Sequence, residues 1–355
     1  MIDLQLFKQI LDFDSTSGKE RPLAQWLLER LEAPRKESFE VGDGTLNLLF
    51  SWGTPKVVFC THMDTVPPYI APSFPEDLLR IYGRGSCDAK GQIIALYSAC
   101  KELEARGCTE FGLLLVSGEE TGSWGAKAFA KTAFRAPYLI IGEPTENKMV
   151  SACKGTLSYE LTFRGEAFHS GYPQYGTSAV DLFVVFYNRL KATDFGIDPE
   201  LGETTWNVGL LHSDNPQNIL SPELTCRIYF RTTFLSHQKV QDWMENVVEG
   251  EGLSGAFART GSRSDAEGSP SPSGSLSVSR VGLGDTPSRY LTLEGLPAAP
   301  ASFGSDAPHL TNFTHKAICG PGSIRHAHRP DEQISLQELE TAVAQYVQMA
   351  VEIIG

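Results

Sequence analysis

The sequence predicts a doubly wound α/β domain with a mostly parallel sheet, which carries an inserted ferredoxin-like α+β domain. Three observations support this fold class. Continuous apolar segments, typical of buried parallel strands, recur at 57–60, 111–116 and 138–141, with a helical pattern between them. After Lys154, apolar residues alternate with polar ones, which is typical of half-exposed strands. Beyond residue 274 the chain returns to apolar segments.

Periodicity and helix-end signals predict the remaining elements of the first domain. Ser17 and Glu20 have the spacing of a capping box, and Pro22 suits the first turn of the helix that follows. Ser335 and Glu338 have the same spacing before the last helix. The other elements expected here are helices over 4–11, 90–106 and 126–131 and strands over 38–41 and 46–50.

The region of alternating residues predicts the inserted domain. Its expected elements are a strand over 157–163, a helix over 178–190, strands over 205–211 and 224–230, a helix over 238–248 and a last strand over 256–259. This β-α-β-β-α-β order is that of the split ferredoxin-like unit. Residues 261–274 are rich in Ser, Gly and Pro, so they predict a flexible loop.

Composition and charge restrict the classes of function. The chain has 355 residues, a length typical of about two domains, and a formal net charge of -13. This charge argues against a nucleic-acid-binding protein, because no basic surface is available to hold phosphates. The 7 cysteines have no Cys-x-x-Cys spacing, so neither a disulfide framework nor a thiolate zinc site is expected. With no secretion signal or membrane span in the sequence, we expect a soluble protein of the reducing cytoplasm.

A histidine and an aspartate follow the first buried strand. His62 and Asp64 are two residues apart, so on an extended chain their side chains point to the same side. Catalytic sites of open α/β sheets lie where strands end in this way. A neutral imidazole can bind a metal, and a neighbouring carboxylate can fix its tautomer.

Two adjacent carboxylates, Glu119 and Glu120, follow the second buried strand. Like charges raise one another's pKa, and a bound cation would remove this repulsion. Neighbouring side chains diverge, so one of the two could bind a metal while the other accepts a proton. The alternative is an ordinary solvated acidic loop.

Three further segments carry side chains of the same kinds. The glycine-containing loop 83–91 presents Asp88 just before a helix, where it could also be an N-cap. This loop lacks both the Gly-x-Gly-x-x-Gly pattern and the Gly-Lys-Ser/Thr of a phosphate loop, which argues against a nucleotide site. Glu143 follows the third buried strand, and His326 and His328 lie in a glycine-rich turn.

Together these segments supply one aspartate, two glutamates and two histidines as possible ligands, with one glutamate to spare. Oxygen and imidazole ligands without thiolates suit zinc, with cobalt or manganese as alternatives. Five ligands are too many for one tetrahedral ion with an open position. They suit two divalent ions about 3.5–4 Å apart that share a bridging carboxylate.

These segments, in this order, resemble the motif series of the M20 metallopeptidase family. The matching motifs are His62-Met-Asp64, Gly83-Arg-Gly with Asp88 and Lys90-Gly91, Glu119-Glu120, Gly142-Glu-Pro-Thr145 and Ala327-His-Arg-Pro-Asp-Glu332. Within the family the sequence is most similar to acetylornithine deacetylases and succinyl-diaminopimelate desuccinylases, and the resemblance covers nearly the whole chain. It implies that two ions are bound per chain and that a linear amide bond of a small N-acyl amino acid is hydrolysed.

The resemblance also implies a role for each residue of the site. His62 and Glu143 would hold one metal, Glu120 and His328 would hold the other, and Asp88 would bridge both. Asp64 would orient His62, and Glu119 would be the general base.

The inserted domain carries three further candidates by the same resemblance. His169 matches a family histidine that reaches the site, commonly from the partner subunit of a dimer, although it could be a structural loop residue. Asn218 and Arg231 match substrate-binding positions. A planar guanidinium suits an α-carboxylate, but an ordinary strand arginine is the alternative for Arg231. Ser305 and Asp306 could line the pocket, and no role is assigned to them.

Because His328 must meet His62, the catalytic domain is expected to be discontinuous, over 1–154 and 275–355. Residues 155–274 would form a lid or dimerisation domain. The leading expectation is an N-acetylornithine deacetylase of arginine biosynthesis. Alternatives are an exopeptidase of the same family, a succinyl-diaminopimelate desuccinylase, a non-catalytic binding protein on this scaffold and a hydrolase with Cys87 as nucleophile. The last is disfavoured, because the charge of Asp88 would raise the thiol pKa.

Overall fold

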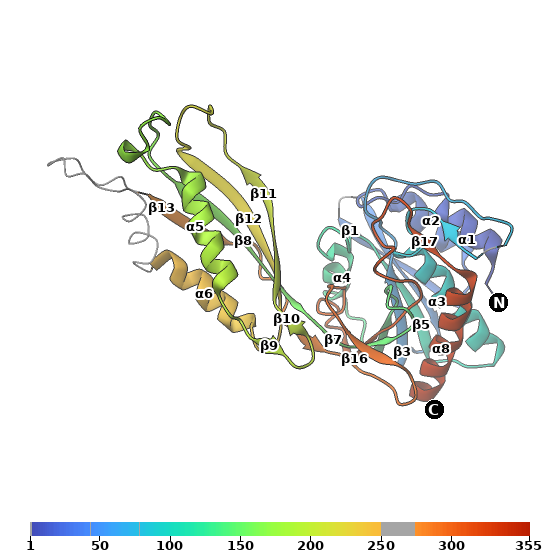
Figure 1. Cartoon of the computed structure of the whole chain (residues 1–355). Coiled ribbons are helices and arrows are strands. Elements are labelled where there is room, and N and C mark those ends of the chain that lie inside the picture. Colours follow the sequence, from blue (N-terminus) through green and yellow to red (C-terminus); the bar gives the residue numbers. More distant parts are fainter. Residues whose placement is uncertain (1, 43, 78, 250–273) are drawn as a thin grey trace. The chain divides into compact units, whose positions relative to one another are not determined.

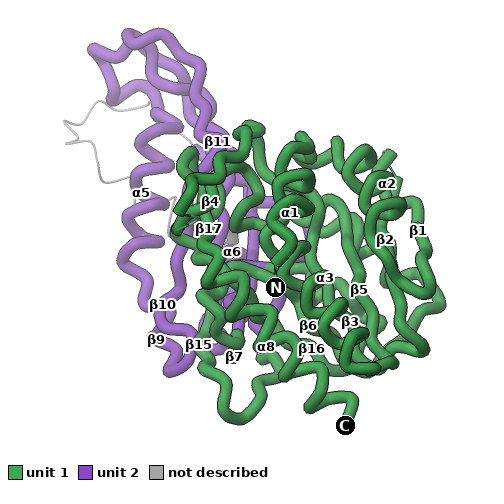
Figure 2. Tube along the Cα trace, turned by 90° about the vertical axis from the view of Figure 1, so that its right-hand side faces the viewer, with its two compact units in different colours: residues 1–151, 289–301, 305–355 green, residues 152–288, 302–304 purple. Residues whose placement is uncertain are grey.

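The computed structural model describes residues 2–42, 44–77, 79–249 and 274–355 (Figure 1). The chain divides into two compact units (Figure 2). Unit 1 contains Met1–Ser151, Arg289–Ala301 and Ser305–Gly355, and unit 2 contains Ala152–Ser288 and Ser302–Gly304. None of the helices in these described ranges is both long and apolar enough to cross a membrane.

A six-stranded sheet forms the centre of unit 1, with strand order β1-β2-β5-β3-β6-β16. Its strands are β1 Arg35–Gly42, β2 Thr45–Trp52, β3 Val57–His62, β5 Phe111–Val116, β6 Ala136–Ile141 and β16 Phe313–Ile318. The pairs β5–β3, β3–β6 and β6–β16 are parallel, whereas β1–β2 and β2–β5 are antiparallel. Every residue of β3 and β5 is buried, as the continuous apolar segments predict.

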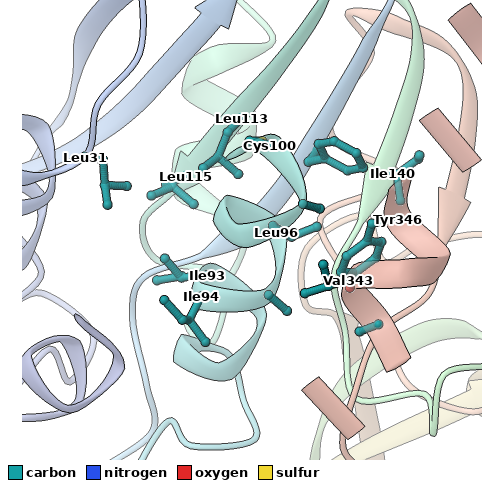
Figure 3. Close-up of a cluster of buried hydrophobic side chains, with 14 of the residues drawn as sticks. Leu31, Ile93, Ile94, Leu96, Cys100, Leu113, Leu115, Ile140, Val343 and Tyr346 are labelled. Atoms are coloured by element: carbon teal, nitrogen blue, oxygen red, sulfur yellow. The ribbon is translucent and has the colours of Figure 1, made fainter. Parts of the chain in front are cut away.

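Helices pack against this sheet or, in the case of α1, against a helix that does. They are α1 Leu4–Leu11, α2 Arg21–Arg30, α3 Lys90–Ala105, α4 Trp124–Phe129 and α8 Leu336–Ile354. Figure 3 shows Leu96 of α3 in one cluster with the strand residues Leu113 and Leu115 and the α8 residue Val343. The core therefore joins helices that are distant in sequence and fixes the strand ends that carry the site.

The two predicted capping boxes have different outcomes. Ser335 caps α8, and its hydroxyl and the Glu338 side chain make the reciprocal bonds of a capping box. The prediction for α2 was wrong, because that helix begins at Arg21 without a side-chain cap. The Ser17 hydroxyl instead donates a hydrogen bond to Asp64 Oδ2 at 2.9 Å. A contact 47 residues away thus replaces the local motif.

Unit 2 has the β-α-β-β-α-β order of its prediction, around an antiparallel sheet of order β11-β12-β8-β13. Its elements are β8 Gly155–Arg164, α5 Ala179–Ala192, β11 Thr205–His212, β12 Glu223–Thr232, α6 His237–Glu249 and β13 Ser275–Arg280. The helices and sheet share a separate apolar core that includes Phe163, Phe186 and Phe230. The predicted fold class is therefore confirmed.

The fourth strand of this sheet is β13, after the serine-rich segment. The strand predicted over 256–259 and the loop predicted over 261–274 lie outside the described residues, apart from Gly274.

Short strands complete the chain. The structure contains a three-stranded sheet of order β14-β7-β15, formed by β7 Met149–Cys153, β14 Ser288–Arg289 and β15 Ala298–Ala301. In unit 2, β9 Ile197–Asp198 pairs with β10 Gly202–Glu203. In unit 1, β4 Ile81–Tyr82 pairs antiparallel with β17 Gln333–Ile334. This last pair places the segment after His328 beside the loop that contains Asp88.

Candidate metal centre

Unit 1 brings the five candidate ligands together in two groups that share one residue. His62, Asp88 and Glu143 form one group, and Asp88, Glu120 and His328 form the other. Within each group, one ligand atom per residue lies within 4.8 Å of the others. The positions come from five separate segments of the chain, so only the fold makes them neighbours.

The end of β3 places His62 between two aspartates. His62 Nε2 lies 3.0 Å from Asp88 Oδ1, and Nδ1 lies 3.0 Å from the carbonyl oxygen of Asp64 and 3.4 Å from its Oδ1. Burial lowers the pKa of His62, but the hydrogen bonds to Asp64 and Asp88 outweigh burial and raise the pKa well above its ordinary value. The imidazole is thus oriented by Asp64, with Nε2 directed to Asp88.

Asp64 also holds the turn that carries the two adjacent glutamates. Its Oδ1 accepts the backbone N–H of Glu119 at 3.0 Å, and its Oδ2 accepts the N–H of Glu120 at 3.1 Å. Asp64 is fully buried, and Ser17 donates a third hydrogen bond to it. One carboxylate therefore contacts His62 and holds the backbone of both glutamates. The bonds to the glutamates are a connection that no sequence pattern indicates.

Asp88 and His328 connect the second group. His328 Nε2 lies 3.0 Å from Glu120 Oε1 and 3.4 Å from Asp88 Oδ2. Hydrogen bonds to Asp88 and Glu120 raise the pKa of His328 to about 10. His326, the other histidine of this turn, belongs to neither group.

Two carboxyl groups, of which Glu143 is buried and Glu119 half-buried, make the centre unfavourable without a counter-charge. Burial raises the pKa of Glu143 well above its ordinary value; the charge of His62 opposes this, and the charges of Asp88 and Glu119 add to it. Burial likewise raises the pKa of Glu119 well above its ordinary value. Ionised carboxylates at these positions would be stabilised by a nearby cation.

The residues present fit divalent cations. The donor set is two imidazoles and three carboxylates without a thiolate, which suits zinc, cobalt or manganese. One carboxylate, that of Asp88, offers Oδ1 to one group and Oδ2 to the other. This is the arrangement that a carboxylate shared by two ions requires.

The alternatives that the sequence left open for this loop do not match the structure. The N-cap of α3 is Ala89, with no side-chain hydrogen bond, so Asp88 is not a helix cap. Burial, followed by the charges of Asp88 and Glu332, raises the pKa of the Cys87 thiol well above its ordinary value. A thiolate nucleophile is therefore disfavoured at Cys87.

The three candidates of the inserted domain lie in unit 2. His169 is exposed and forms a bridge with Ile219, and the carbonyl oxygen of Asn218 accepts the N–H of Ser170 at 2.9 Å. Arg231 lies on β12, with its guanidinium 4.9 Å from the centre of the Tyr229 ring. The segments of His169 and Asn218 are therefore neighbours within this unit.

Asp306 is a further buried carboxyl group of unit 1, to which sequence reasoning assigns no role. Burial raises its pKa to about 6, while the charge of His62 lowers it. The charge of Asp306 also raises the pKa of Glu119 and of Glu143. The sequence suggested that Asp306 could line the pocket, but it carried no signal for this effect on Glu119 and Glu143, because the residue is far from both in the chain.

Comparison with known proteins gives consistent matches. A sequence model of peptidase family M20/M25/M40 matches residues 58–267. A peptidase M20 domain-containing protein of Schizosaccharomyces pombe is 29% identical over 361 residues, which cover 98% of this chain and 83% of that protein. A probable carboxypeptidase of Aspergillus flavus is 29% identical over 384 residues, covering 97% and 85%.

Solved structures share the fold over the whole chain. A tripeptidase from Staphylococcus aureus aligns with a TM-score of 0.79 at 18% identity, covering 100% of this chain and 99% of that one. A dinuclear metal-binding peptidase of the M20 family from Bacillus subtilis aligns with a TM-score of 0.66 at 10% identity, covering 99% and 97%.

Proposed function

The chain belongs to peptidase family M20/M25/M40, and from this premise we propose that it removes the acyl group of an N-acyl amino acid, with N-acetylornithine as its substrate. Family membership makes the protein a hydrolase of amide bonds. The observation that carries the proposal is the pair of ligand groups that share Asp88, with Glu119 beside them.

His62, Asp88 and Glu143 would hold one divalent ion, and Asp88, Glu120 and His328 would hold a second. We propose zinc for both, with cobalt or manganese as alternatives. Such ions act as Lewis acids and make water more acidic.

The other residues handle protons and substrate. Glu119 belongs to neither ligand group, and its backbone is held by Asp64, so its carboxylate is available to take a proton from the attacking water. It would then deliver a proton to the leaving amine. His169 is proposed as a donor to the tetrahedral oxyanion, and Asn218 and Arg231 as contacts to the amino-acid portion.

The proposal extends to assembly and location. We propose a homodimer formed through the inserted domain, with His169 acting on the site of the partner subunit. Cys60, Cys87, Cys100, Cys108, Cys226 and Cys319 are free thiols, which suits the reducing cytoplasm.

The names of relatives favour a second candidate, an exopeptidase that releases a C-terminal amino acid. Both reactions cleave an amide bond next to an amino acid with a free α-carboxylate, so the same residues serve either. A panel of N-acetyl and N-succinyl amino acids and dipeptides, assayed for released amine, separates the two. Hydrolysis of dipeptides without any deacylation would reject the first candidate and support the second.

Replacing Glu119 tests the mechanism separately from metal binding. We expect Glu119→Gln to lose at least about 100-fold in kcat, because general acid–base catalysis contributes roughly that much or more. Metal content, measured by elemental analysis, should equal that of the unmodified protein. Glu29→Gln, on an exposed turn of α2, is the matched control. An unchanged kcat in Glu119→Gln would reject its role as base.

A further inference from the structure

A buried ion pair joins two segments of the candidate metal centre, the loop that ends in Asp88 and the turn that carries His328. Arg84 Nη1 donates to Glu332 Oε2 at 2.5 Å, and both side chains are almost fully buried. The two residues are 248 positions apart in the sequence. Neither belongs to a ligand group.

Glu332 organises the loop that ends in Asp88. Its Oε1 accepts the backbone N–H groups of Gly85, Cys87 and Asp88 at 3.0, 3.1 and 3.0 Å. A single carboxylate oxygen therefore collects three N–H groups of a short loop. The loop can wrap around it because Gly85 has a φ of +84°, where a side chain would also approach Lys90 and Thr65 to 2.9 Å.

The same pair also fixes the segment of His328. Arg84 Nη1 donates to the carbonyl oxygen of Arg329 at 3.2 Å, directly after His328. The N–H of Gly83 donates to the carbonyl oxygen of Glu332 at 3.1 Å, and β4 pairs with β17 just beyond. The loop of Asp88 and the turn of His328 are thus held to each other at both ends.

We propose that Glu332, together with Arg84, is a positioning residue of the metal centre. Glu332 sets the position of Asp88 relative to His328. Because Asp88 belongs to both ligand groups, both groups depend on Glu332. Fixed outer partners of this kind orient the groups that bind a metal. The inference rests on the proposed function only in that the five ligands bind divalent ions.

The test is a titration of metal-stripped protein with Co²⁺. Calorimetry and the visible absorption of bound cobalt monitor the binding. Glu332→Gln keeps the size of the side chain but replaces one carboxylate oxygen with an amide NH2 group, which cannot accept a hydrogen bond from Arg84. We expect both Co²⁺ dissociation constants to rise by about 10–100-fold. Constants equal to those of the unmodified protein would overturn the inference.

Controls separate positioning from a general loss of stability. Asp331→Asn makes the same chemical change at the adjacent position, where Asp331 is exposed and pairs with Arg329, so its constants should not change. Val343→Ala removes packing from the core of α8 and should lower the melting temperature with unchanged constants. An equal weakening of Co²⁺ binding in Val343→Ala would also overturn the inference.

A second variant and the unmodified protein provide further tests. If Glu332→Gln does not fold, Arg84→Lys keeps the positive charge but loses the guanidinium that reaches both Glu332 and Arg329. Weaker Co²⁺ binding in that variant supports the inference, and unchanged binding overturns it. If the unmodified protein binds no Co²⁺, the proposed metal site itself is rejected. That result differs from equal Co²⁺ binding by the unmodified protein and the variant, which overturns only the role of Glu332 and Arg84.

Discussion

At the scale of the residue, Asp64 serves several backbone and side-chain groups at once. It contacts His62 and accepts hydrogen bonds from Ser17 and from the N–H groups of Glu119 and Glu120. A carboxylate with that many partners is locked in place, because each buried hydrogen bond to a charged group contributes on the order of 1.5–3 kcal/mol. The precision of the site thus begins with a residue that belongs to neither ligand group.

His169 carries a prediction that follows from its tautomer. Its Nδ1 accepts the N–H of Gly171 at 3.0 Å, so the proton of the neutral ring is on Nε2, which can donate to an oxyanion. We expect His169→Ala to lower kcat by about 100-fold or more, with a smaller effect on KM. Steady-state kinetics measure both constants.

The matched control for this prediction is His212→Ala, which removes another exposed histidine of unit 2. If His169→Ala and His212→Ala have the same kinetics, His169 is a structural loop residue.

Glu20 makes the stability of the fold depend on pH. It is fully buried, and burial raises its pKa from 4.5 to about 7. The folded chain therefore holds this proton more tightly than the unfolded chain, and stability falls as pH rises from about 4.5 through about 7. A shift of this size corresponds to on the order of 3 kcal/mol.

We expect Glu20→Gln, which stays neutral, to lose less unfolding free energy than the unmodified protein between pH 5 and pH 8. Urea unfolding of metal-free protein at several pH values measures this dependence. Glu340→Gln, at an exposed position of α8, should keep the original slope. Parallel pH profiles for Glu20→Gln and the unmodified protein would contradict the prediction.

At the scale of the element, the same short motif acts in two ways. The Ser335 hydroxyl accepts the N–H of Glu338 and starts α8, which packs against α3. Ser17 has the same spacing from Glu20, but its hydroxyl donates to Asp64. A capping box is a local signal. Its serine hydroxyl can instead form a hydrogen bond with a buried charged group elsewhere in the fold.

For α8 we expect Ser335→Ala to lower the unfolding free energy by about 1 kcal/mol, because the N–H of Glu338 loses its acceptor. Chemical denaturation measures this change. Ser335→Asn, whose side chain can also cap a helix, should recover most of the loss. Equal stability of Ser335→Ala and the unmodified protein would show that the cap does not contribute.

At the scale of the whole molecule, the described residues form two separate apolar cores, one in each unit, and all five candidate ligands lie in unit 1. A ligand that binds only the folded state stabilises that state by mass action. Metal binding should therefore act on unit 1.

We expect Zn²⁺ added to metal-stripped protein to slow hydrogen exchange in β3, β5 and β6, with little change in β8 and β12. At a free concentration of 100 times Kd, one site contributes about 2.7 kcal/mol. Hydrogen exchange followed by mass spectrometry resolves the two groups of strands. Equal protection of both units, or none, would contradict a metal centre confined to unit 1.

The sequence by itself determined the fold class and the order of the elements. Segments such as 57–60 and 111–116 report burial through local apolar patterns, and β3 and β5 follow them closely. The motifs also named the five residues that the fold brings into two groups, although their roles as ligands remain predictions.

Only the tertiary structure decided how these residues are held. Asp64 accepts a hydrogen bond from the backbone of Glu119, and Ser17 donates to Asp64 instead of capping a helix. Glu332 accepts the N–H of Asp88, which is 244 residues away in the chain. The physical reason is that periodicity and capping signals arise from neighbours in the chain. A hydrogen bond between distant segments depends on the packing that brings them together and leaves no local pattern.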